Sequence, residues 1–90
     1  MAVAKVHHLK ILECYADAVY YGDKTFEIRN DADRGFQRGD LIRFTVIDAD
    51  RRKVDHILQD ETFEITYVLP YVGLKEFFVA LSIRNIRARD

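Results

Sequence analysis

Short segments in which apolar and polar residues alternate constrain the fold of this chain more than any other feature of its sequence. In one of them, Phe26 and Ile28 alternate with Thr25, Glu27 and Arg29. Successive side chains of a β-strand point to opposite faces, so such alternation predicts strands. In another, Phe63, Ile65, Tyr67 and Leu69 share one face. The predicted strands lie at residues 6–12, 24–29, 41–48, 61–70 and 77–87.

One segment has the period of a helix. Five residues after the first predicted strand fall at helical spacing on a single face, and Gly22 follows where a helix C-cap is expected. The five are Leu12, Tyr15, Ala16, Val19 and Tyr20. One short helix cannot cover both faces of an open five-stranded sheet. Curling the sheet into a barrel solves this problem and removes exposed edges, so we predict a small α+β barrel.

Length and composition indicate one soluble domain over residues 1–90. The chain has one proline and four scattered glycines, and no stretch resembles a linker. Lys and Arg number 14 against 15 Asp and Glu, which excludes nucleic-acid binding through bulk charge but leaves a local basic face open. No apolar run reaches membrane length and no signal peptide opens the sequence, so we expect a cytoplasmic protein without a membrane partner.

Charged and polar side chains gather on the second predicted strand and in the loop that follows. The strand carries Lys24, Thr25, Glu27 and Arg29, of which the last three project from one face at intervals of about 6.6 Å. Two interpretations remain open on spacing alone. The residues either form a solvated sheet face with a Glu27–Arg29 ion pair, or they line a binding cleft. The loop adds Asp31, Asp33 and Arg34.

Other reactive residue types give weaker signals. His7 and His8 are neighbours on a strand and face opposite ways, and His56 lies far along the chain, so we expect no metal site. The single cysteine, Cys14, excludes an internal disulfide and is interpreted as a packed free thiol. No cofactor fingerprint occurs, and we expect no cofactor. We expect most phenylalanines in the core, whereas the tyrosines offer stacking surfaces.

Several motifs together resemble a known family. They are His7, Leu9–Ile11, Gly22, Lys24–Arg29, Asp33–Arg34, Phe36, Gly39–Asp40, Thr66–Tyr67 and Gly73–Leu74. With this order and spacing, nearly the whole chain resembles the small ASCH-type, PUA-like domains. Within them it is most similar to the bacterial and phage family catalogued as domain of unknown function 3850. The resemblance implies a five- to six-stranded PUA-like barrel with the helix over one opening.

The resemblance also implies a cleft beside the second strand that holds RNA or a nucleotide-like ligand. Lys24 and Arg29 would then meet phosphate, and Glu27 would accept from a base edge or hold Arg29 in place. Tyr67 or Tyr71 would supply stacking, and Asp31 and Asp33 compete for one role in the loop. The site residues expected on this basis are His7, Lys10, Lys24, Thr25, Glu27, Arg29, Asp33, Arg34 and Tyr67.

Two alternatives stay open. A related branch of ASCH-type domains includes amidohydrolases that deacetylate a modified cytidine, with a lysine, a threonine three residues later and a distant glutamate. Lys24 matches the lysine, but Glu27 stands at the threonine position, so Lys24 and Glu27 are the catalytic candidates and Glu64 is a guess for the distant acid. The other alternative is a protein-interaction module of phage or bacterial origin, which an exposed apolar patch would favour. The sequence leaves the ligand and the oligomeric state open.

Overall fold

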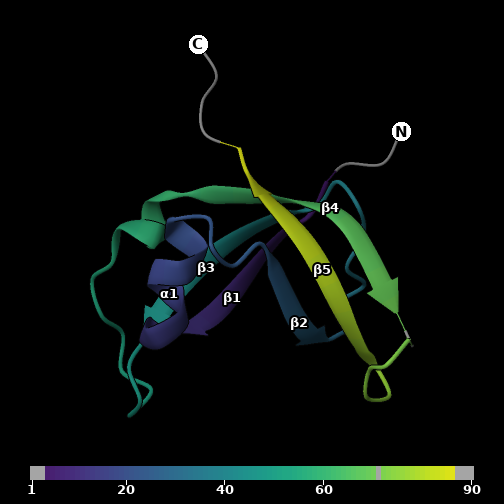
Figure 1. Cartoon of the computed structure of the whole chain (residues 1–90), viewed down its shortest axis with the longest axis horizontal. Helices are drawn as coiled ribbons and strands as arrows, with labels where there is room; N and C mark the ends of the chain where they lie inside the picture. Colours follow the sequence, from purple (N-terminus) through teal and green to yellow (C-terminus); the bar gives the residue numbers. More distant parts are fainter. Residues whose placement is uncertain (1–3, 71, 87–90) are drawn as a thin grey trace.

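A computed structural model describes residues 4–70 and 72–86, and the succession of strands and helix follows the predicted order (Figure 1). The elements are β1 (Val6–Leu12), α1 (Glu13–Tyr20), β2 (Phe26–Asn30), β3 (Leu41–Ile47), the 3₁₀-helix η1 (Ile57–Asp60), β4 (Thr62–Pro70) and β5 (Phe78–Asn85). Only one helix was expected, and the segment between β3 and β4 adds η1. Within the described ranges, no helix has the length and apolarity that a bilayer crossing requires.

All five strands belong to one curled sheet with the order β1-β3-β4-β5-β2. The β1–β3 pair is parallel and the other three pairs are antiparallel. Parallel neighbours need a long crossover, which here contains α1 and β2. In Figure 1 the sheet forms a half-barrel, with α1 beside β1 and β3. The α+β class and the curled sheet are therefore confirmed, and β1 and β2 form the two edges of the sheet.

The core fills the inner side of this curl. Strands β1, β3, β4 and β5 contribute alternate side chains, and Ala16 and Val19 of α1 and Leu58 of η1 close one end. The inward residues of the strands are Leu9, Ile11, Ile42, Phe44, Val46, Phe63, Ile65, Val79, Leu81 and Ile83. The alternation of residues 41–47 places Ile42, Phe44 and Val46 on one face, and this face is the buried one.

On β2 the predicted orientation is wrong. Phe26 and Ile28 are about half exposed on the outer side, and Glu27 between them is buried on the inner side. The reason is the position of β2 at the edge of the sheet. Its inner side meets cations, which satisfy Glu27, instead of the apolar centre of the curl. Phe77, before β5, is also exposed instead of buried.

On β4 the shared face of four apolar residues is interrupted. The register against β5 shifts between Ile65 and Tyr67, because a β-bulge adds one residue there. One extra residue exchanges inner and outer positions for the rest of a strand. Tyr67 and Leu69 therefore lie on the outer side, and Val68 packs against the core in their place.

The end of α1 is fixed by Gly22, as predicted. Its φ is +84°, and its N–H donates to the carbonyl of Val19 (3.2 Å) while the N–H of Asp23 donates to that of Ala18 (2.9 Å). These two bonds form a Schellman motif, which places a left-handed residue after the helix. This motif turns the chain directly into Lys24 and β2.

We expect Gly22→Ala to lower the free energy of unfolding by about 1 kcal/mol, because a Cβ strains the left-handed conformation. No atom lies within 4 Å of the new Cβ, so backbone strain alone carries the effect. Urea denaturation of wild type, Gly22→Ala and Gly22→Asn measures it. Asparagine tolerates this conformation better and should lose less. Equal midpoints for all three proteins would contradict the role of Gly22.

Candidate functional site

A hollow of about 520 Å³ lies between the two edges of the sheet, where β1 and β2 approach each other. Residues of β1, of α1 and of the segment from Lys24 to Arg29 surround it. The lining residues are Lys10, Ile11, Leu12, Tyr15, Lys24, Phe26, Glu27, Ile28 and Arg29. We call this hollow the edge cleft. It brings together Lys10, Lys24, Glu27 and Arg29, four of the site residues named from the sequence.

Glu27 is the centre of the polar contacts in the edge cleft. Its buried carboxylate accepts from Nε (3.0 Å) and Nη2 (2.6 Å) of Arg29 through Oε1, and from Nζ of Lys24 through Oε2. A buried carboxylate is stable only when it is paired and hydrogen-bonded. The same contacts fix the Arg29 and Lys24 side chains, which would otherwise sample many rotamers in water.

The arginines of this region also contact the free edge of β1. Nη2 of Arg29 donates to the carbonyl of Lys10 (2.8 Å), and Nη1 of Arg34 contacts the carbonyl of His8 at 3.4 Å. Carbonyls on an edge strand lack a strand partner, and cationic donors satisfy them without adding a strand. Arg29 thus links the two edges of the sheet across the cleft.

Charge and aromatic surface coincide in the edge cleft. Three cationic side chains and one carboxylate line it, a net charge of +2. Tyr15 and Phe26 are each about half exposed, and Nζ of Lys24 lies 6.0 Å and 4.8 Å from their ring centroids. Such a site is complementary to an anion that carries a flat ring.

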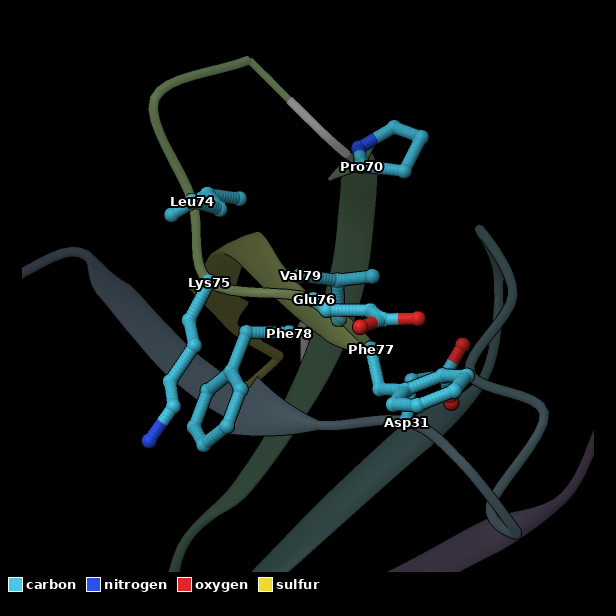
Figure 2. A pocket seen from close by; sticks show the side chains of 8 residues that line it. All are labelled: Asp31, Pro70, Leu74, Lys75, Glu76, Phe77, Phe78 and Val79. Atoms are coloured by element: carbon cyan, nitrogen blue, oxygen red, sulfur yellow. The ribbon is translucent and has the colours of Figure 1, made fainter.

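A second hollow, of about 540 Å³, lies at the connection between β4 and β5 (Figure 2). In Figure 2 the ring of Phe77 lies close to Asp31, and the side chains of Lys75 and Phe78 lie together below Leu74. Its charged lining residues are Asp31, Lys75 and Glu76, a net charge of −1. The two hollows therefore differ in the sign of their charge, and the edge cleft is the one suited to an anion.

His7, expected beside the cleft, lies on the inner side of β1 instead. Its Nε2 donates to Oδ2 of Asp40 (2.9 Å), and its ring lies 4.6 Å from that of Phe36. Asp40 also accepts from the backbone N–H of Lys5 (3.2 Å) and of Gln37 (3.1 Å). This buried network joins β1 to the start of β3, and none of its residues lines the edge cleft.

The remaining predicted site residues are dispersed. Thr25 is exposed, and its carbonyl accepts from the N–H of Ile83 (3.1 Å). Asp33 and Arg34 are exposed in the loop after β2, and Tyr67 lies on the outer side of β4. Tyr71 lies outside the described residues.

Of the two loop aspartates, Asp31 has a contact that orders the loop. Oδ1 of Asp31 accepts from the N–H of Phe36 (2.9 Å), so Asp31, not Asp33, ties this loop together.

Cys14 is exposed instead of packed. Within residues 4–70 and 72–86, no three His, Cys, Asp or Glu side chains are placed to hold a metal ion.

Sequence reasoning missed part of the lining. Phe26 and Ile28 were assigned to the core, and Leu12 to the helix face, yet all three line the edge cleft. Tyr15 was recognised only as one of several possible stacking residues. The signal that identifies them is the pairing order of the strands, which places β1 and β2 at opposite edges of one curled sheet.

Comparison with known proteins assigns the chain to a family. No curated protein matches it. A family model described as Domain of unknown function (DUF3850) matches residues 6–83, which extend from the start of β1 into β5 and include every residue of the edge cleft. The chain therefore belongs to the DUF3850 family.

Proposed function

We propose that this chain is a PUA-like, ASCH-type domain whose edge cleft binds RNA or a nucleotide-like ligand. One observation carries the proposal: three cations and two half-exposed aromatic rings surround a single hollow with a net charge of +2. Phosphate requires the cations, and a base requires a ring or an apolar surface against which to stack. The net charge of the whole chain is −1, so this local excess is what would attract an anion.

Each residue has a distinct role in this proposal. Lys24 and Arg29 contact phosphate, and Lys10 adds positive potential at the rim. Glu27 holds Arg29 through two of its nitrogens, and Nη1 of Arg29 makes no hydrogen bond to the described part of the chain. Tyr15 and Phe26 flank Lys24 and supply the stacking surface that was first assigned to Tyr67.

Titration with a short fluorescent single-stranded RNA at several salt concentrations tests the proposal. Two phosphate contacts predict that log K falls against log salt with a slope of about −1.4, since each contributes about −0.7 on a single strand. Lys24→Ala and Arg29→Ala should each weaken binding about tenfold and reduce the slope by about 0.7. Fluorescence anisotropy measures both quantities.

Lys53→Ala and Arg52→Ala are the matched controls, because both residues are exposed in the segment between β3 and β4. They should bind like wild type. Binding that Lys24→Ala and Arg29→Ala leave unchanged would place the ligand elsewhere, and absence of binding to any RNA or nucleotide would reject the function.

The geometry favours binding over amide hydrolysis. Thr25 is not among the residues that line the edge cleft, and the hydroxyl found there is the phenol of Tyr15. Lys24 and Glu27 are paired with each other, and none of their hydrogen bonds in the described structure joins them to a hydroxyl. Release of cytidine from an acylated cytidine, abolished by Lys24→Ala, would reverse this preference.

A further inference from the structure

The outer side of β2, β5 and β4 carries an apolar surface that shares Phe26 and Ile28 with the edge cleft and extends from them over β5 and β4. Strand pairing aligns its residues in two rows, and each row places a small side chain of β5 between two large ones from the flanking strands. The rows are Phe26–Ser82–Tyr67 and Ile28–Ala80–Leu69. We call these six residues the outer face. Its four large members are 38–59% exposed.

This surface departs from the usual pattern of a half-buried sheet. An antiparallel sheet with one buried side normally presents polar residues to water on the other. Here the inversion of β2 and the bulge of β4 both turn large apolar residues outward, toward the same area. A contiguous exposed apolar surface marks an interaction site more often than scattered apolar residues do.

The charges around the outer face indicate an apolar occupant. None of its six residues is charged, and the neighbouring Arg84 and Glu64 on the same side pair with each other. A nucleic-acid backbone would need unpaired cations at this surface. Lys24 of the edge cleft lies against the ring of Phe26 at the border of this surface, and its charge is paired with Glu27.

We propose that the outer face docks against the outer face of a second copy of this chain, forming a two-fold symmetric dimer. The surface is complementary to itself, because large side chains on β2 and β4 flank the small Ala80 and Ser82 of β5. When two such sheets stack about 10 Å apart, the large side chains of one fit over the small ones of the other. A two-fold axis uses one patch twice and needs no second site.

The area of the outer face corresponds to the apolar centre of a standard interface and not to the whole of one. A buried aromatic side chain removes about 150–250 Å² from water, so the half-exposed Phe26 and Tyr67 offer about 200 Å² together. With Ile28 and Leu69 the apolar centre reaches about 300–400 Å² per copy. A standard interface buries about 800 Å² per partner with an apolar centre and a polar rim. The outer face supplies the centre, and Arg84, Glu64 and their neighbours supply the rim.

Sedimentation equilibrium of the purified full chain, freed of nucleic acid, tests the dimer. We expect a mass of twice 10.6 kDa that falls toward 10.6 kDa on dilution. Ile28→Glu should give the monomer mass at every concentration. Ile57→Glu is the matched control, because Ile57 on η1 is also 51% exposed but lies outside the outer face, and it should remain dimeric.

Leu69→Glu is the second variant, since Leu69 lies on β4 away from the edge cleft, and far-UV circular dichroism verifies that each variant is folded. A monomer at millimolar concentration would overturn the dimer and leave the outer face for another protein. A dimer that survives both Ile28→Glu and Leu69→Glu would show that a different surface makes the contact. Because mass is measured without ligand, neither result depends on whether the edge cleft binds RNA.

Discussion

Asp40→Ala lowers the free energy of unfolding by about 3 kcal/mol, an expected loss that urea denaturation measures directly. Asp40 is buried, and its carboxylate accepts from His7 Nε2 and from the backbone N–H groups of Lys5 and Gln37. Alanine removes the acceptor of all three donors at once. A buried donor left without a partner costs about 1–3 kcal/mol, and partial rehydration keeps the sum below three full penalties.

The pH dependence of the free energy of unfolding provides an independent measurement of the contribution of Asp40. Burial raises the pKa of Asp40, but hydrogen bonds from His7 and from the backbone of Lys5 and Gln37 lower it, and the net pKa lies below 3.8. Its folded pKa is therefore below its unfolded one. The resulting stability is present above about pH 4 and is lost as the pH falls through the folded pKa. Asp40→Asn should lose this acid-dependent part.

Asp33→Ala is the control, because Asp33 is an exposed carboxylate in the loop that precedes Asp40. It should stay within about 0.5 kcal/mol of wild type. An Asp40→Ala protein that unfolds at the wild-type urea midpoint would show that the network joining β1 to β3 does not stabilise the fold.

The sequence predicted the elements of the fold because its periodic signals are local. The alternation in residues 41–47 and the helical spacing of Ala16 and Val19 depend on neighbours within a few positions. Gly22 identified the end of α1 for the same reason, since a left-handed residue there favours glycine whatever surrounds it. Because one short helix cannot cover both faces of an open five-stranded sheet, we could also predict that the sheet curls.

The side of the sheet that a side chain faces could not be predicted where it depends on residues distant in the sequence. Glu27 is buried because Lys24 and Arg29 meet it at the edge of the sheet, and the alternation around it suits either side equally. No Gly or Pro marks the bulge after Ile65 in the sequence, so Tyr67 was placed on the same face as Phe63 and Ile65. For the same reason His7 was assigned to the cleft, although Asp40, 33 residues away, holds it on the inner side of β1.

Replacing Glu27 separates the structural role of the edge cleft from its electrostatic one. Glu27→Ala should lower the free energy of unfolding by about 2–3 kcal/mol, because it leaves Lys24 and Arg29 close together without their carboxylate. Those side chains are 21% and 24% exposed, so water relieves part of the cost of two unpaired charges. Urea denaturation, with Glu76→Ala as the exposed control, measures the loss.

The same substitution raises the net charge of the lining from +2 to +3. If Glu27 holds Arg29 for a nucleotide, Glu27→Ala should bind inorganic polyphosphate more tightly than wild type does and show a steeper salt dependence. Its preference for RNA over polyphosphate should fall, because Glu27 no longer holds the Arg29 guanidinium with Nη1 turned to the ligand. Glu27→Gln keeps one acceptor oxygen, so its preference for RNA over polyphosphate should lie between those of wild type and Glu27→Ala. An unchanged preference in both variants would mean that charge alone, without the orientation that Glu27 imposes, governs what the edge cleft binds.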